Sequence, residues 1–195
     1  WIPDNNRERQ EYLLMYLIWH QTYVKSEELC DFLYVSKTTL SKSLKNVEMI
    51  LKRYALRIDR KPNYGICMVG DEFDIRRLIC DYFVKRNCLV EMDSDHMEQE
   101  IQELASYIQK QLDAYEIRLS ETAFENFVEY VYISWKRIRY GHCVTRKVEV
   151  LPEIGKREEM FVKKLTRHLA ESGGISYTSE EEAYLLLYLA GKRMV

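Results

Sequence analysis

Hydrophobic residues recur along most of this chain at the three- and four-residue spacing of amphipathic helices. The first such stretch is residues 7–20, where a nearly continuous apolar run follows a charged turn and predicts a largely buried helix. A shorter helix should follow, with Ser26 as its N-cap and an apolar face made of Leu29, Phe32 and Leu33.

The strongest helical pattern of the first half begins at Ser36, a second predicted N-cap. Its apolar stripe alternates spacings of four and three residues and consists of Leu40, Leu44, Val47, Leu51 and Tyr54. The opposite face carries only polar or basic side chains before Glu48, namely Lys37, Thr38, Ser41, Lys42, Lys45 and Asn46. A face of this composition suits an anionic partner.

Two short segments with strand-like alternation come next, at residues 56–60 and 66–70. The Pro-Asn-Tyr-Gly sequence between them is typical of a turn, so a β-hairpin is predicted. Asp71 should then cap a helix that runs towards Arg86.

Beyond residue 95, three or four long amphipathic helices are predicted, with no convincing strand between them. Ser120 should cap one of these helices, and Ser179 with Glu182 forms the pattern of a capping box at the start of the last. The composition agrees, because seven Gly and three Pro are few for a loop-rich or all-β chain, and a 47% hydrophobic content suffices for real cores.

The net charge of −2 hides an uneven distribution, since residues 1–92 sum to +2 and residues 93–195 to −4. Within residues 35–61, eight Lys or Arg stand against only Glu48 and Asp59, so a charge of +6 is concentrated in one helix and the segment after it. The chain is therefore not uniformly basic, but it contains one basic surface.

A helix, a short helix, a tight turn, a capped helix with a basic face and a hairpin follow one another in the order of a winged helix-turn-helix. The third helix can enter a DNA major groove while the hairpin neutralises the backbone beside it. The candidate DNA-binding residues are Lys37, Thr38, Thr39, Ser41, Lys42, Lys45, Arg60 and Lys61. The competing interpretation is a solvated helix face, as most charged helix faces are.

The fold class is therefore mainly α: a winged helix-turn-helix with a short β-hairpin, followed by a helical bundle. We expect the first domain over residues 1–90 and the second over residues 91–195, with a linker at residues 87–95.

The first half resembles the Mga-type helix-turn-helix of bacterial regulators of sugar phosphotransferase operons. The segments that carry the resemblance are VSKTTL at residues 35–40, KPNYGI at 61–66 and GDE at 70–72. In those regulators this unit is often the second of two. The resemblance therefore also implies an alternative role in packing or dimerisation, in place of base reading.

The second half, from about residue 97 to 192, resembles the phosphotransferase-system regulation domain (PRD). The matching stretches lie in residues 120–141 and 180–189. In that family two histidines in these stretches accept phosphoryl groups and change how the domains pair into dimers. Here both positions are tyrosine, Tyr130 and Tyr188, and tyrosine lacks the imidazole nucleophile. The resemblance then implies a dimerising scaffold that is not phosphorylated in the usual way.

Other roles for these positions stay open. Tyr130 and Tyr188 are expected to complete a core or a dimer interface, and the alternative is recognition of a ligand or locking of one dimer state. The four histidines are expected at surface or cap positions, with His142 as an alternative phosphoacceptor because it follows the first matching stretch; the other three are His20, His96 and His168.

Other chemistry is not indicated. The five cysteines show no Cys-x-x-Cys spacing, and no Gly-rich phosphate loop, nucleophile elbow, carboxylate pair or metal cluster occurs. We therefore expect no enzyme, no catalytic residue, no metal and no cofactor. No apolar run approaches the roughly 20 residues of a membrane span, which favours a cytoplasmic protein. The chain lacks an initiator Met and ends in a helical pattern, so we expect it to be cut from a longer protein.

The patterns and resemblances together predict a fragment of a transcription regulator of carbohydrate phosphotransferase or sugar-metabolism genes. Its expected partners are double-stranded DNA, a second copy in a homodimer, and phosphotransferase-system proteins through other domains, with no membrane. One alternative is a protein-interaction module without nucleic-acid contact. Another is an RNA antiterminator, but those begin with a small β-rich RNA-binding domain in place of a helix-turn-helix.

Overall fold

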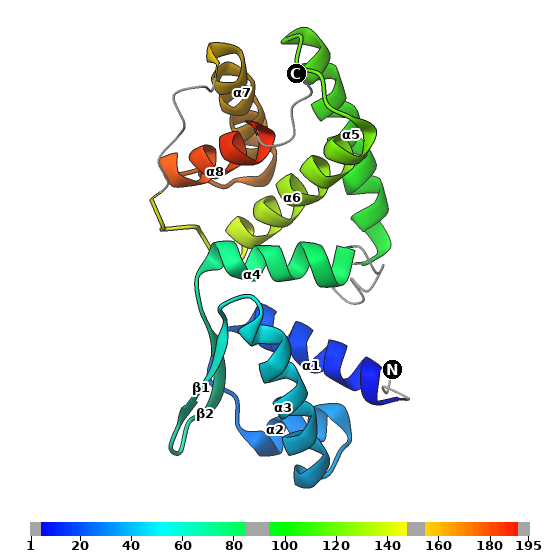
Figure 1. Ribbon diagram of the computed structural model, residues 1–195, viewed down its shortest axis with the longest axis vertical. Helices are drawn as coiled ribbons and strands as arrows, with labels where there is room; N and C mark the ends of the chain where they lie inside the picture. The colour runs from blue at the N-terminus through cyan, green and yellow to red at the C-terminus, as the bar shows by residue number, and fades with distance from the viewer. Residues whose placement is uncertain (1–4, 85–93, 148–154, 191–195) are drawn as a thin grey trace. The chain divides into compact units, whose positions relative to one another are not determined.

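The computed structural model describes residues 5–84, 94–147 and 155–190 (Figure 1). The chain forms two compact units, Trp1–Leu78 and Ile79–Val195, and each is described by itself. The domain boundary expected between residues 90 and 91, and most of the linker expected around it, lie outside the described residues.

The first unit contains three helices, a two-stranded antiparallel sheet and a fourth helix in its described part (Figure 1). The helices are α1 (Asn6–His20), α2 (Ser26–Leu33), α3 (Lys37–Lys52) and α4 (Glu72–Ile79), and the strands are β1 (Arg57–Lys61) and β2 (Gly65–Val69). This is the order of a winged helix-turn-helix, so the predicted fold of the first half is confirmed.

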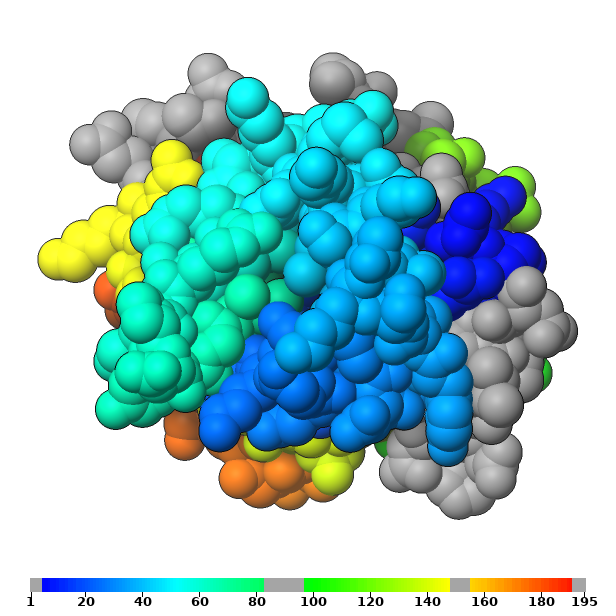
Figure 2. Space-filling model, turned by 90° about the horizontal axis from the view of Figure 1, so that it is seen from below, coloured from blue at the N-terminus to red at the C-terminus, as the bar shows by residue number. Residues whose placement is uncertain are grey.

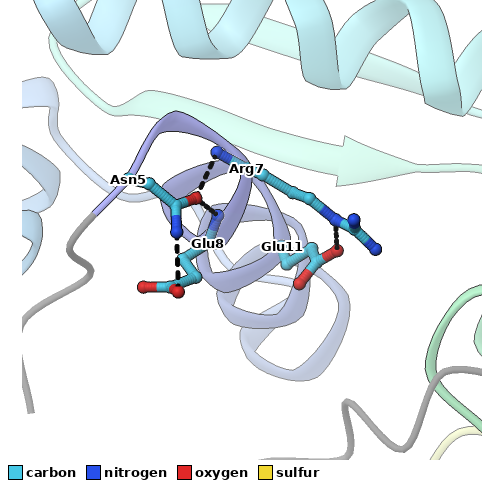
Figure 3. Close-up of polar contacts among 4 residues, drawn as sticks. All are labelled: Asn5, Arg7, Glu8 and Glu11. Atoms are coloured by element: carbon cyan, nitrogen blue, oxygen red, sulfur yellow. Dashed lines mark hydrogen bonds and ion pairs between the residues drawn. The ribbon is translucent and has the colours of Figure 1, made fainter.

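Helix α1 begins at a cap formed by Asn5 (Figure 3). The Asn5 side-chain oxygen accepts from the backbone N–H groups of Arg7 and Glu8, both at 2.9 Å, and its amide donates to the Glu8 carboxylate at 2.7 Å. Arg7 also pairs with Glu11 one turn later, at 3.1 Å. The two backbone contacts to Asn5 satisfy donors that the first turn of a helix cannot pair internally. The apolar run behind them supplies the buried residues Leu13, Leu14, Met15, Leu17 and Ile18.

The prediction for α2 is wrong at its start. Lys25 occupies the N-cap position without a side-chain hydrogen bond, because Ser26 is already the first helical residue. Leu29 and Leu33 are buried as expected. Phe32 remains 42% exposed and lies against two tyrosines of α1, Tyr12 and Tyr16, with ring centroids 5.7 and 4.8 Å away.

Helix α3 follows the predicted pattern closely. The Ser36 hydroxyl caps it by accepting from the Thr39 backbone N–H at 3.2 Å. The buried side of the helix consists of Leu40, Ser43, Leu44, Val47 and Leu51. Tyr54 lies beyond the end of the helix and is half-buried. The helix therefore packs by its apolar stripe and leaves its basic face outward.

The hairpin is joined to the helix-turn-helix by a bridge between Val24 and Ile66. Each backbone N–H of this pair donates to the carbonyl of the other at 2.9 Å. Gly65, the residue before the bridge, has φ +108°, and a Cβ there would overlap the Val24 carbonyl. Only glycine adopts this backbone without strain and leaves room for the close approach.

Asp71 caps α4 as predicted, because its carboxylate accepts from the Phe73 backbone N–H at 2.9 Å. The helix then widens into a π-helical turn, η1 (Cys80–Val84), so it does not continue as a regular α-helix through Tyr82. Arg86, the expected end of the helix, lies outside the described residues.

In the described part of the second unit, η1 is followed by four longer helices. Its helices are α5 (Ser94–Ala114), α6 (Glu121–Arg139), α7 (Lys156–Gly173) and α8 (Ser179–Ala190). They share one core, in which Phe127, Val131, Phe161, Val162, Leu165 and Leu185 are among the buried residues. The predicted bundle of long helices is confirmed.

One cap in this unit is as predicted and one is not. Ser120 accepts from the Ala123 backbone N–H at 3.2 Å and begins α6. The capping box at the start of α8 is wrong by one residue, because Thr178, not Ser179, accepts from a first-turn N–H. The Glu182 carboxylate accepts from the Thr166 hydroxyl at 2.9 Å, so it ties α8 to α7.

Replacement of Gly65 by Ala should destabilise the first unit. The positive φ and the overlap with the Val24 carbonyl together predict a cost of roughly 3 kcal/mol. Urea unfolding followed by circular dichroism measures this cost, and amide exchange at Val24 and Ile66 should accelerate with it.

Gly141→Ala is the control, because Gly141 also has a positive φ but an added Cβ would meet nothing within 4 Å. It should cost only about 1 kcal/mol. Equal losses for the two variants would show that the Val24–Ile66 bridge does not constrain position 65.

Candidate nucleic-acid interface

The outward face of α3 gathers most of the basic and polar residues predicted to bind DNA. Five of them are exposed: Lys37, Thr38, Ser41, Lys42 and Lys45. Their positions along the helix place them on one side, opposite the buried stripe. No acidic residue lies in the first turn of α3, so no carboxylate of the helix offsets its N-terminal dipole, although the Ser36 hydroxyl already accepts from one first-turn N–H.

Thr39 has a different environment from its neighbours. It is half-buried, and its hydroxyl lies 3.0 Å from the Ser36 hydroxyl within the cap. The structure therefore gives this side chain a local contact that stabilises the start of the helix. Its predicted contact with DNA has to compete with that cap.

The two basic residues predicted on the hairpin, Arg60 and Lys61, lie at the end of β1 and are exposed. The Lys61 ammonium sits over the Tyr64 ring, 4.2 Å from its centroid, and 5.7 Å from the centroid of Tyr23. The Tyr23 hydroxyl donates to the Asp59 carboxylate, and this hydrogen bond raises the tyrosine pKa. The aromatic rings thus hold Lys61 in place at the tip of the hairpin.

The sequence pattern did not identify Tyr23 as part of this cluster. Its partner Asp59 is 36 residues away, and only folding brings the two together. Tyr64 does have a local signal, because it follows Lys61 by three residues across the predicted turn.

A groove of about 520 Å³ separates α3 from the hairpin. Four of the predicted residues line it: Lys37 and Ser41 from α3, and Arg60 and Lys61 from β1. Its other lining residues are Ser26, Leu40, Leu44, Pro62, Gly65 and Ile66. Figure 2 shows α3 and the hairpin on the same face of the first unit. Thr38, Lys42 and Lys45 are exposed on α3 but do not line the groove.

Two of these cations are paired with carboxylates of the protein. The Lys37 ammonium donates to Glu27 of α2 at 2.7 Å, and this hydrogen bond lowers the Glu27 pKa and raises the Lys37 pKa. Arg60 donates to Glu48 of α3 at 2.6 Å. Both pairs are substantially exposed to solvent, where an ion pair contributes little net stability and exchanges readily.

The second unit brings together the two tyrosines singled out in its sequence. Tyr130 of α6 is 1% exposed, and Tyr188 of α8 is half-buried. Their rings are stacked, with centroids 4.3 Å apart and planes 8° from parallel. Burial raises the Tyr188 pKa to about 12, and Cys80, Glu129 and Asp81 add to the rise by charge repulsion. Two tyrosines that are 58 residues apart in the sequence therefore form a direct contact between α6 and α8.

The histidines differ in their surroundings and exposure. His20 stacks on Tyr16 at the end of α1, with centroids 4.0 Å apart. His142 is half-buried just after α6, and its backbone N–H donates to the Arg137 carbonyl at 3.0 Å. The His96 side chain lies outside the described residues.

Neither a metal centre nor a membrane span is found in the residues that the structure describes. Over residues 5–84, 94–147 and 155–190, no group of three or more His, Cys, Asp and Glu side chains could hold a metal ion. In the same ranges no helix is both long and apolar enough to cross a bilayer.

A hairpin wing, a capped third helix and a basic groove between them place the first unit in the class of winged helix-turn-helix domains. Residues 3–83 match the family model of the Mga helix-turn-helix domain. The resemblance of the first half to that domain is therefore confirmed.

The chain is also similar over nearly its whole length to a curated bacterial protein, the "Probable licABCH operon regulator" of Bacillus subtilis (strain 168). The two are 28% identical over 200 residues, which cover 99% of this chain and 31% of that protein. The chain thus spans about a third of the length of this relative.

Tyr188 should stay protonated well above the pH at which an ordinary tyrosine ionises. Its pKa is about 12 in the folded chain and about 10 in an unfolded one. This group therefore leaves stability unchanged below pH 10 and lowers it as the pH rises from 10 to 12, because the unfolded chain loses the proton first. Nuclear magnetic resonance of tyrosine labelled with ¹³C at Cζ measures the titration.

Tyr188→Phe assigns the signal, since this variant should lose one late-titrating resonance. The prediction is contradicted if the removed resonance titrates near pH 10 with the exposed tyrosines.

Proposed function

We propose that this chain is part of a transcription regulator of carbohydrate phosphotransferase or sugar-metabolism genes, and that its first unit binds double-stranded DNA. The observation that carries the proposal is the groove between α3 and the hairpin, which Lys37, Arg60 and Lys61 line. The similarity to a protein named as an operon regulator supports the same function.

In this proposal α3 enters the major groove with its N-terminus leading. The groove of B-DNA is about 12 Å wide and admits one helix. Thr38, Ser41 and Lys42 then face base edges, while Lys37 and the N-terminal backbone N–H groups of α3 meet phosphates. Arg60 and Lys61 neutralise the backbone on the side of the hairpin. Most of the affinity is then electrostatic and depends on salt.

A second candidate is a packing or dimerisation role for the same face. The ion pairs of Lys37 with Glu27 and Arg60 with Glu48 favour it, because they partly neutralise the groove from within. We prefer DNA binding because both pairs are exposed, so a phosphate can replace each carboxylate at little cost.

For the second unit we propose a dimerising scaffold of the PRD type that has lost its phosphorylation switch. The stacked pair of Tyr130 and Tyr188 supports this, since both rings are committed to the contact between α6 and α8. Phosphate sensing then belongs to other domains of the full-length regulator, which are also the proposed point of contact with phosphotransferase-system proteins.

Removal of two charges from α3 should weaken DNA binding. Lys37→Ala combined with Lys42→Ala is expected to lower the affinity for a duplex from the regulated operon's upstream region. The logarithmic salt dependence should also become shallower, by about one unit for each phosphate that the variant no longer neutralises. Fluorescence anisotropy over a series of salt concentrations measures both effects.

The matched control is Lys110→Ala with Lys156→Ala, which removes the same charge from exposed positions in the second unit. Glu48→Gln provides a test of the opposite sign, because it frees Arg60 and removes a repulsive carboxylate, so affinity should rise. Unchanged binding in both the Lys37/Lys42 and the Glu48 variants would favour the packing role.

The second unit should not accept phosphate from a phosphohistidine donor. Incubation with the phosphocarrier proteins and ³²P-labelled phosphoenolpyruvate is expected to leave the chain unlabelled, because a tyrosine hydroxyl replaces imidazole at both positions. Tyr130→His with Tyr188→His is the informative comparison, since it restores the nucleophile. Stoichiometric label on the unaltered chain, at His142 or elsewhere, would rule out the loss of the switch.

A further inference from the structure

A second groove, of about 480 Å³, lies between α5 and α7 in the second unit. The half-buried rings of Tyr107 and Tyr115 form its α5 side. Its α7 side consists of Met160, Lys163, Lys164, Arg167, His168 and Glu171. The volume falls in the range of small-molecule sites, roughly 300 to 1,000 Å³.

The charges in this groove are unbalanced. Lys163, Lys164 and Arg167 are exposed, and none forms an ion pair with another residue in the described ranges. Arg157, which precedes this groove on the same helix, does pair, with Glu116 at 2.9 Å. Glu171 is the sole carboxylate among the lining residues. The half of the chain that contains the groove is otherwise negative overall.

Two of the cations are neighbours on the surface of α7. Lys163 and Arg167 are separated by four residues, so they lie side by side on α7, with Glu159 and Glu171 at the same spacing on either side of the pair. A single bound anion can therefore contact both of them. This spacing suits a small, doubly charged group such as phosphate, which can accept a hydrogen bond from each cation.

The aromatic side adds a second kind of contact. Tyr107 stacks on His168, with ring centroids 3.8 Å apart and planes 11° from parallel, which fixes both rings at the wall of the groove. Tyr115 is held edge-on to the buried Phe161, with centroids 6.2 Å apart. Flat apolar walls suit the C–H faces of a compact organic ring, and Glu171 can accept hydrogen bonds from hydroxyl groups on it.

We propose that this groove binds a phosphorylated monosaccharide. The phosphoryl group lies among Lys163, Lys164 and Arg167, and the sugar ring lies against Tyr107 and Tyr115. This site is separate from the proposed DNA interface and does not depend on it, since it uses only residues of α5 and α7 and the turn that follows α5.

Calorimetric titration of the whole chain at low salt tests the proposal with three probes: glucose 6-phosphate, inorganic phosphate and glucose. Glucose 6-phosphate should bind more tightly than inorganic phosphate, and glucose should bind least. Lys163→Gln with Arg167→Gln should weaken glucose 6-phosphate binding by about tenfold or more, because two charge-assisted hydrogen bonds no longer form. Tyr115→Leu should weaken it while leaving inorganic phosphate unaffected.

The matched control is Lys110→Gln with Lys156→Gln, which removes two exposed charges that do not line the groove and should leave binding unchanged. An equal loss in this control would overturn the assignment of the site. So would the absence of measurable binding of glucose 6-phosphate, or equal affinities for glucose 6-phosphate and inorganic phosphate. Displacement of glucose 6-phosphate by duplex DNA would indicate a general polyanion surface and would also overturn the proposal.

Discussion

The geometry of the first unit depends on one backbone bridge, the mutual pair of hydrogen bonds between Val24 and Ile66. It joins the chain between α1 and α2 to the second strand of the hairpin and so fixes the wing beside the helix-turn-helix. The bridge anchors the strand that supplies Gly65 and Ile66 to the lining of the groove between α3 and the hairpin. A glycine next to the bridge is the sequence requirement for that approach.

Local sequence signals were enough for most of the fold. The apolar stripe and Ser36 cap of α3, and the turn of the hairpin, are encoded within a few residues, and the structure has them as predicted. The caps at Ser26 and Ser179 were wrong by one residue, because a second polar residue precedes each serine, Lys25 and Thr178, and the local pattern does not say which of the two comes before the first helical turn. The π-helical turn after α4 has no local signature in this sequence.

For the candidate sites, the sequence identified the residues but not the partners that they contact. The basic residues of α3 and the hairpin could be named, because their charges stand out in the sequence. Their partners Glu27 and Glu48, and the ring of Tyr23 beside Lys61, could not, because each contact joins segments that meet only in the fold. For the same reason the stacking of Tyr130 on Tyr188 was not foreseen, although both positions were singled out.

The two carboxylates beside the basic groove have a consequence for how a regulator of this kind discriminates among DNA sites. Lys37 and Arg60 are each already paired with a carboxylate. A polyanion that approaches them without replacing that carboxylate therefore gains little binding energy. A phosphate must arrive at the position and angle of the displaced carboxylate to gain from the exchange, at Lys37 and at Arg60 together. Under the proposed function, Glu27 and Glu48 thus act as competitors within the protein, and they convert general attraction into a requirement for correct docking.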